Sequence, residues 1–220
     1  MSAKLDWNGF TSALCDIPAL GFRLDPSLMD APRVLAAVRP KWPEALAAMQ
    51  ELVAGAIANP DENRQVGHYW LRAPELAPDP DTAARIRDTG ASVRSFAKRV
   101  LDGSLRPERG GRFTRLLVVG IGGSALGPQF LAHALADRER GLKPYFLDNT
   151  DPVGMDAVFA EIGAGLSETL VVVISKSGGT PETRNGLIET AEAYGRAGLD
   201  FGRHAVAVTG VVSALDREAA

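Results

Sequence analysis

From about residue 113 onward, short aliphatic runs alternate with segments of helical character, and this alternation constrains the fold more than any other feature. The runs are 116–119, 145–147, 170–174 and 205–208. They are spaced by roughly one βαβ repeat each. Parallel strands that are buried on both faces lose the alternation of apolar and polar residues, as these runs do. The sequence therefore predicts a doubly wound, mostly parallel α/β sheet of the flavodoxin-like kind.

Proline and small polar residues indicate where helices begin between the strands. Asp151 is followed by Pro152, and Thr180 is followed by Pro181 and Glu182. Asp and Thr are good N-cap residues, proline suits the first helical position, and an acid in the first turn suits the helix dipole. Helices are therefore predicted to start directly after residues 151 and 180.

The sheet is expected to be incomplete at the end of this sequence. The last of the four predicted strands ends at Thr209. Another helix start follows around Ser213, shortly before Ala220. Doubly wound sheets of this kind commonly carry five strands or more. We therefore expect a truncated chain that belongs to a longer protein and that exposes apolar surface on its own.

Residues 1–105 show a different pattern and are predicted to be a helical N-terminal segment before an α/β domain at 106–220. One amphipathic helix is expected across 43–58, with 59–61 as its stop. A second is expected from about 81 to 102, where Gly103 ends it. The apolar positions of the first are Leu46, Met49, Leu52, Val53 and Ile57.

Two loops of the same design follow the first and third aliphatic runs. One is Gly120-Ile121-Gly122-Gly123-Ser124, and the other is Ser175-Lys176-Ser177-Gly178-Gly179-Thr180. Glycine lets backbone N–H groups point at a ligand that a larger side chain would keep away. Phosphate is the natural ligand of such a loop.

The carboxyl ends of parallel strands lie at one edge of a sheet, where ligands of open α/β folds bind. If the two strands are neighbours, Ser124 from one loop can face Ser175, Ser177 and Thr180 from the other. Two helix N-termini, each equivalent to roughly +0.5 charge, would point at the same place. A phosphate monoester carries about −1.5 to −2 at neutral pH, so its charge suits these donors.

Other interpretations of these loops stay open at this point. Gly120-Ile121-Gly122-Gly123-Ser124-Ala125 fits the dinucleotide fingerprint Gly-x-Gly-x-x-Ala, with Asp148 as a candidate ribose ligand, although the second loop has no role there. Neither loop has the Walker spacing, which disfavours a nucleoside triphosphate. Gly120 and Gly127 could serve tight turns only. Lys176 either contacts the phosphate or lies solvated at the rim.

Composition argues against several classes of partner. The net charge is −3, and no local basic stripe is present, so no nucleic-acid partner is expected. The longest aliphatic runs are about five residues, far short of the ~20 of a membrane-spanning helix. The single cysteine, Cys15, and an N-terminus unlike a signal peptide predict a cytoplasmic protein.

Candidate catalytic groups are absent from this sequence. His68, His133 and His204 are interpreted as structural, and Glu182 as a partner of the helix dipole. The residues form no paired carboxylate, nucleophile–base or metal-ligand pattern. The sequence predicts a binding site with no catalytic residue and no metal in this chain.

The two loops together resemble the hallmark segments of the phosphoglucose isomerase family in its bacterial form. The first resemblance runs from Gly120 to Pro128 and the second from Ser175 to Thr183. The segments 148–152 and 209–215 also resemble the family, and 63–72 does so more weakly. The strong matches cover residues 116–183.

The resemblance implies a sugar isomerase (SIS) domain that binds the phosphate of a hexose 6-phosphate. By position, Ser175, Ser177 and Thr180 would hold the phosphate with Lys176 beside it, while Gly123 and Ser124 would lie near the sugar. The family interconverts glucose 6-phosphate and fructose 6-phosphate in glycolysis and gluconeogenesis, without a cofactor. The resemblance also implies a homodimer for the full-length protein.

The family's catalytic glutamate, histidine and lysine, and its second SIS domain, are expected beyond the end of this chain. The 220-residue chain alone is therefore predicted to bind hexose 6-phosphate but to be inactive. The alternative is an SIS-type sugar-phosphate sensor without catalysis. A regulator of that kind should carry a helix-turn-helix with a basic recognition helix, which 1–105 does not show.

Overall fold

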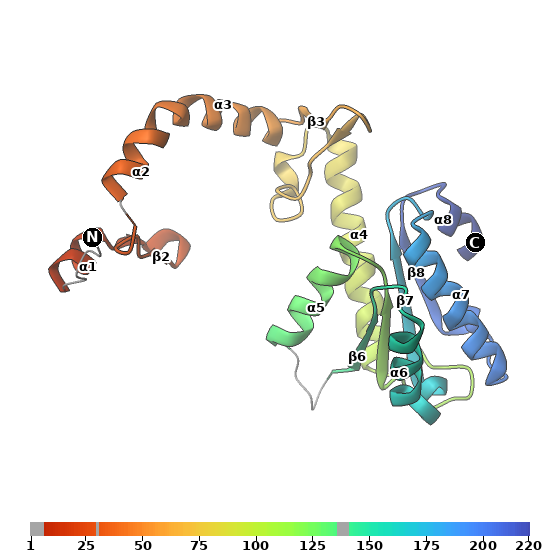
Figure 1. The fold of residues 1–220 in the computed structure, drawn as a ribbon. Helices are drawn as coiled ribbons and strands as arrows, with labels where there is room; N and C mark the ends of the chain where they lie inside the picture. Colours follow the sequence, from red (N-terminus) through yellow and green to blue (C-terminus); the bar gives the residue numbers. More distant parts are fainter. Residues whose placement is uncertain (1–6, 30, 136–140) are drawn as a thin grey trace. The chain divides into compact units, whose positions relative to one another are not determined.

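The computed structural model describes residues 7–29, 31–135 and 141–220. The chain divides into two compact units, Met1–Ala91 and Ser92–Ala220, and the division falls within one long helix, α4 (Pro80–Leu101) (Figure 1). The domain limits predicted from the sequence, 1–105 and 106–220, stay a prediction.

The first unit contains short helices, two small sheets and the start of α4. Trp70 is its most buried aromatic residue, and the Trp70 indole donates a hydrogen bond to the Val53 carbonyl at 2.9 Å. The elements that precede α4 are α1 (Trp7–Ala13), β1 (Cys15–Ile17), η1 (Pro18–Leu20), β2 (Phe22–Leu24), α2 (Ala31–Val38), η2 (Arg39–Lys41), α3 (Trp42–Val53), β3 (Ile57–Asn59), β4 (Arg64–Gln65) and η3 (Pro74–Leu76).

The structure corrects two expectations for this half of the chain. Strands β1 and β2, and strands β3 and β4, pair as antiparallel hairpins, so the segment is not only helical. The helix expected across 43–58 ends at Val53, and Ile57 lies in β3. Gly55 has a φ of +101°, which few other residues adopt and which turns the chain out of the helix. By contrast, α4 matches the predicted helix closely.

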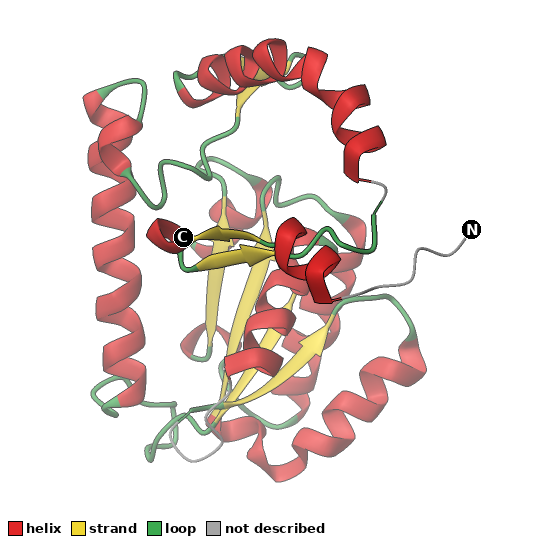
Figure 2. Ribbon diagram, turned by 90° about the vertical axis from the view of Figure 1, so that its left-hand side faces the viewer, coloured by secondary structure: helices red, strands yellow, loops and turns green. Residues whose placement is uncertain are grey.

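The second unit is a doubly wound α/β domain, as predicted. Its strands pair in the order β6-β5-β7-β8, and every pairing is parallel. Figure 2 shows these strands running side by side among the helices. Its elements after α4 are β5 (Arg115–Val119), α5 (Gly123–Leu135), β6 (Lys143–Leu147), α6 (Pro152–Ile162), η4 (Gly163–Glu168), β7 (Thr169–Ser175), α7 (Pro181–Arg196), η5 (Phe201–Arg203), β8 (Ala205–Thr209) and α8 (Ala214–Ala219).

Alternate residues of the strands point to opposite faces of the sheet, and each face has its own core. Leu117 and Val171 belong to the larger cluster, which packs against α6, α7 and α8. Leu116 and Leu170 point the other way, toward Val100 at the end of α4. Burial on both faces explains why these strands appear as continuous aliphatic runs.

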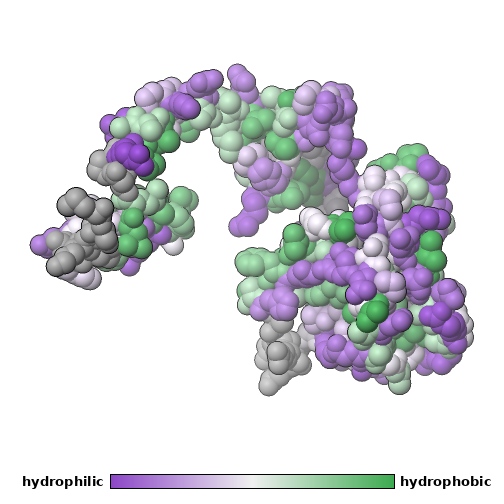
Figure 3. Space-filling model, in the orientation of Figure 1, coloured by the Kyte–Doolittle hydropathy of each residue, from purple (hydrophilic) through white to green (hydrophobic). Residues whose placement is uncertain are grey.

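Helix α5 keeps much of its apolar surface exposed. Figure 3 shows apolar residues gathered along this helix. The side chains concerned are Leu126, Phe130, Leu131 and Leu135, which are 55 to 74 % exposed. The isolated chain therefore carries apolar surface, as the sequence led us to expect.

Candidate functional site

The order of the strands places the two glycine-containing loops side by side. Strand β5 pairs directly with β7 in parallel. The chain leaves β5 toward β6 on one side of this pair, and it leaves β7 toward β8 on the other side. Loops that diverge in this way form the crevice in which doubly wound folds bind their ligands. The prediction that the two strands are neighbours is confirmed.

The first loop, Gly120–Gly122 with the first residues of α5, lies against the end of β7. The Gly120 amide donates to the Leu147 carbonyl at 3.1 Å, which joins it to β6. A Cβ added at Gly120 would lie 3.1 Å from the Ile174 carbonyl oxygen and 3.0 Å from the Ser124 Cβ. Glycine thus allows both Ser124 and the end of β7 to approach the backbone closely. Ser124 itself is partly buried, and Gly123 is exposed.

The second loop, Ser175–Thr180, is organised around one buried hydroxyl. Ser175 is only 3 % exposed, and its Oγ accepts from the Gly178 amide at 3.1 Å. The same hydroxyl donates to Thr180 Oγ1 at 3.3 Å. Ser177 is exposed, and its Oγ accepts from the Gly179 amide at 3.2 Å. Two of the three candidate phosphate ligands are therefore joined directly, and the third lies between them in the loop.

The second loop leads into the N-terminus of α7. Thr180 is the N-cap residue and Pro181 the first helical residue, as predicted. The Thr180 side chain makes no capping hydrogen bond to the described residues of the first turn. Its hydroxyl is therefore directed elsewhere, and the first-turn amides keep their capacity to bind an anion.

Lys176 is exposed, and its backbone carbonyl accepts from the Gly210 amide at 3.1 Å. This bond joins the second loop to a third loop, residues 210–213 between β8 and α8. Thr209, the last residue of β8, donates from Oγ1 to the Ser175 carbonyl at 2.7 Å. Our interpretation of the sequence placed Thr209 in a segment that resembles the family, 209–215, but gave it no role in the site. The available signal was a hydroxyl residue at the carboxyl end of the strand next to β7.

Asp148, the candidate ribose ligand, is already held by two side chains. Its Oδ2 accepts from Gln129 Nε2 at 2.7 Å, and its Oδ1 accepts from Asn149 Nδ2 at 2.9 Å. A carboxylate oxygen can accept more than one hydrogen bond, so these contacts orient Asp148 without deciding between the two interpretations.

His204 lies at the other edge of the sheet. His204 is fully buried at the amino end of β8, and its Nδ1 lies 3.2 Å from the Thr169 carbonyl oxygen. The two glycine-containing loops are at the opposite, carboxyl edge, so His204 lies away from them. Among the residues that the structure describes, no group of three or more His, Cys, Asp or Glu could hold a metal ion.

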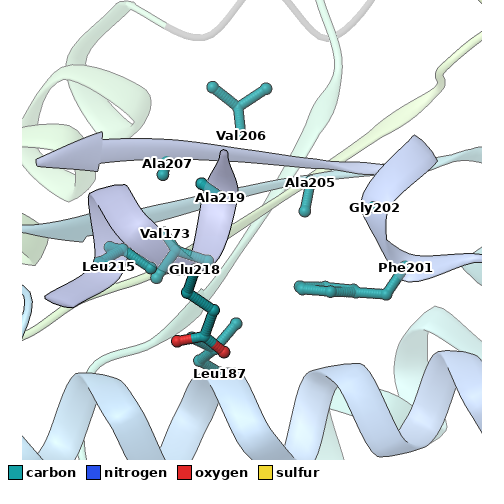
Figure 4. Close-up of a pocket in the computed structure, with 10 residues that line it drawn as sticks. All are labelled: Val173, Leu187, Phe201, Gly202, Ala205, Val206, Ala207, Leu215, Glu218 and Ala219. Atoms are coloured by element: carbon teal, nitrogen blue, oxygen red, sulfur yellow. The ribbon is translucent and has the colours of Figure 1, made fainter.

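A hollow of about 330 Å³ lies beside β8, facing α7 and α8 (Figure 4). Apolar side chains such as Phe201, Leu187 and Leu215 line it, and Glu218 is the only charged residue of the ten labelled. It includes no residue of either glycine-containing loop. This hollow is chemically unsuited to a phosphate and is not the candidate site.

Comparison with known proteins points to one family. A family model described as phosphoglucose isomerase matches residues 41–217. The chain is 54 % identical to the glucose-6-phosphate isomerase of Synechococcus elongatus over 222 residues, and 54 % identical to that of Geobacter sulfurreducens over 221 residues. Each match covers 100 % of this chain and 42 % of the relative. The chain thus spans less than half the length of these curated relatives.

A solved structure agrees with these matches. The crystal structure of a glucose-6-phosphate isomerase from Chlamydia trachomatis superimposes with a TM-score of 0.72 and 27 % identity. The superposition covers 98 % of this chain and 42 % of that one. In the described part of the present chain, none of the helices is both long and apolar enough to cross a membrane.

Proposed function

The chain belongs to the phosphoglucose isomerase family, and from this premise we propose that it supplies the phosphate-binding part of a glucose-6-phosphate isomerase. The observation that carries the proposal is the meeting of the two glycine-containing loops at the point where the chain leaves β5 and β7 in opposite directions. A hexose 6-phosphate is the ligand, with its phosphate between the loops and its sugar toward the first one.

The second loop provides the phosphate ligands in this proposal. Thr180 and Ser177 donate their hydroxyl protons to phosphate oxygens. The buried Ser175 hydroxyl holds the loop in shape through its bonds to Gly178 and Thr180. The first turn of α7 adds backbone amides and the positive end of the helix dipole. Lys176, exposed on the same loop, contributes positive charge at the rim.

Gly123 and Ser124 face the sugar in this proposal. They open α5, whose N-terminus lies at the same edge of the sheet as that of α7. The absence of a side chain at Gly123 lets the ligand approach the backbone, and the Ser124 hydroxyl can bond a sugar oxygen.

In this proposal the base of the isomerisation step lies outside this chain, and the described acids near the two loops are interpreted as structural, with Glu182 as a partner of the α7 helix dipole. Asp148 is bonded to Gln129 and Asn149, and the Asp151 carboxylate caps α6 by accepting from the amides of Val153 and Gly154. A general base must reach the proton on the substrate carbon directly. We therefore assign to this chain the binding of the substrate, and not the proton transfer.

The full-length protein, in this proposal, interconverts glucose 6-phosphate and fructose 6-phosphate in glycolysis and gluconeogenesis. This is a reversible aldose–ketose isomerisation that uses no cofactor. We further infer a cytoplasmic homodimer, in keeping with a free Cys15 thiol and the family assignment.

Titration calorimetry with fructose 6-phosphate tests the binding site. The Thr180→Val variant removes one donor to a charged ligand, which weakens binding by roughly tenfold or more. Thr150→Val, in the loop between β6 and α6, is the matched control and should bind as the unmodified chain does. Equal affinities for the unmodified chain and the Thr180→Val variant would show that the phosphate binds elsewhere.

Isomerase turnover on the same 220-residue chain tests the division of roles. We expect binding of fructose 6-phosphate without measurable conversion to glucose 6-phosphate. Robust turnover would show that a residue of this chain is the base.

A further inference from the structure

The third loop, residues 210–213 between β8 and α8, packs directly on the second loop. Thr209 Oγ1 donates to the Ser175 carbonyl at 2.7 Å, and the Gly210 amide donates to the Lys176 carbonyl at 3.1 Å. The consecutive carbonyls of Ser175 and Lys176 thus accept hydrogen bonds from β8 and the third loop. These contacts come from a strand and loop that follow more than 30 residues later in the chain.

The hydroxyl protons around Thr209 can be assigned by counting. Thr209 Oγ1 lies 2.7 Å from Ser213 Oγ, and either oxygen could be the donor. The one Thr209 proton is used on the Ser175 carbonyl, so Ser213 donates to Thr209. Ser213 Oγ in turn accepts from the Asp216 amide at 3.0 Å. The bonds form a single directional series from Asp216 through Ser213 and Thr209 to Ser175, in which each bond strengthens the next.

The start of α8 packs closely against the second loop. Gly178 has a φ of +69°, and a Cβ there would lie 2.5 Å from the Leu215 nitrogen and 2.8 Å from Ser213 Oγ. The Asp216 carboxylate accepts from the Val212 amide at 2.7 Å, which closes the third loop on itself. The second loop therefore packs against the third loop and the first residues of α8.

We propose that Thr209 is a positioning residue for the phosphate, acting through the Ser175 carbonyl. That bond fixes the peptide plane between Ser175 and Lys176, and so sets the direction in which the Ser177 hydroxyl and the following amides point. A loop held in its binding geometry loses less conformational entropy when the ligand binds. The proposal rests on the proposed phosphate site, and it adds a residue that does not touch the ligand.

The test compares two threonine-to-valine variants on adjacent strands. Thr209→Val keeps the side-chain shape and removes the bond to Ser175. Thr169→Val removes a similar bond, from Thr169 Oγ1 to the Gly165 carbonyl at 2.8 Å, at the opposite end of β7. Affinity for fructose 6-phosphate is measured by calorimetry on the 220-residue chain, together with the unfolding midpoint and amide exchange at Gly178.

We expect Thr209→Val to bind about tenfold more weakly and to exchange the Gly178 amide faster, because one hydrogen bond of the series is lost. Thr169→Val should lower the unfolding midpoint and leave the affinity unchanged. Thr209→Ser, which restores the hydroxyl, should recover most of the affinity. If Thr209→Val does not fold, Ser213→Ala breaks the same series one bond earlier and should weaken binding severalfold.

Three outcomes separate the possibilities. An unmodified chain that binds no fructose 6-phosphate overturns the phosphate site, and with it this inference. Binding by the unmodified chain and equal binding by Thr209→Val overturn the positioning role alone. Equally weakened binding of fructose 6-phosphate in Thr209→Val and Thr169→Val shows a general structural effect. That result also overturns the positioning role.

Discussion

Serine residues of the second loop have different roles that depend on burial. Ser175 is almost fully buried and bonds both Gly178 and Thr180, whereas Ser177 is exposed to an incoming ligand. From the sequence the two are equivalent, because both stand in a glycine-containing loop after an aliphatic run. The distinction depends on which side of the backbone each hydroxyl occupies, and only the folded chain determines it.

Adjacent glycines in the same loop allow a direct test at the residue scale. Gly178→Ala should destabilise the domain by about 1–3 kcal/mol and abolish phosphate binding, because its φ is positive and its Cβ would overlap the start of α8. Gly179→Ala is the matched control for stability alone, since a Cβ there meets no protein atom within 4 Å. Urea unfolding measures the stability of both variants, and calorimetry measures phosphate binding by Gly178→Ala. Equal losses of stability in the two variants would contradict the close packing of α8.

Three helices, α4, α6 and α7, begin after an acidic or hydroxyl residue that is followed by proline. The sequence predicts this start at Asp151 and Thr180, and the structure adds a third case at Asp79, before Pro80 of α4. Asp79 Oδ1 accepts from the Thr82 amide, and Asp79 Oδ2 accepts from the Thr82 hydroxyl, each at 2.8 Å. Such starts depend on a few neighbouring residues, which is why the sequence shows them.

Removing the cap of α6 gives a prediction at the scale of the element. Asp151→Ala should lower the free energy of unfolding by about 1 kcal/mol, because two first-turn amides lose their acceptor. Asp156→Ala, at an exposed position within the same helix, should change it far less. Chemical denaturation followed by circular dichroism compares the two. A larger effect at Asp156 would contradict the capping role.

The cap of α4 predicts a dependence on pH. Hydrogen bonds from the Thr82 amide and hydroxyl lower the pKa of Asp79 from its ordinary value of 3.8. A carboxyl whose pKa is lowered by folding stabilises the fold above its unfolded pKa, and this contribution is lost as pH falls through the folded pKa. Asp79→Asn, which does not titrate, should be less stable than the unmodified chain at neutral pH.

The stability difference between these two proteins should shrink as the pH falls from about 5 to about 2. Thermal unfolding across that range measures it. A difference that stays constant over the range would show that the Asp79 carboxylate has no special stability in the fold.

At the scale of the whole molecule, ligand binding should stabilise the domain selectively. At a concentration one hundred times Kd, fructose 6-phosphate should add about 2.7 kcal/mol and raise the unfolding midpoint by about 5–10 °C. NAD should leave the midpoint unchanged, because the chain belongs to the phosphoglucose isomerase family and the proposed ligand is a hexose 6-phosphate. Protection by NAD alone would reverse the order of the two interpretations.

The strands and several helix starts of the second unit could be predicted from the sequence, whereas the phosphate-binding role of its loops stays a prediction. Strand positions follow from burial on both faces, helix starts follow from capping, and both are readable over a few residues. The hairpins of the first unit could not be predicted from the sequence, because β1, β2 and β3 are short and exposed and carry no alternating pattern.

The neighbours of each strand and the contacts that support the second loop follow from tertiary packing and could not be predicted from the sequence. The order β6-β5-β7-β8 brings two loops more than 50 residues apart into one crevice, and the pairing of β7 with β8 places Thr209 against Ser175. Such contacts depend on how distant segments pack, because a hydrogen bond across strands leaves no trace in the local pattern of residues.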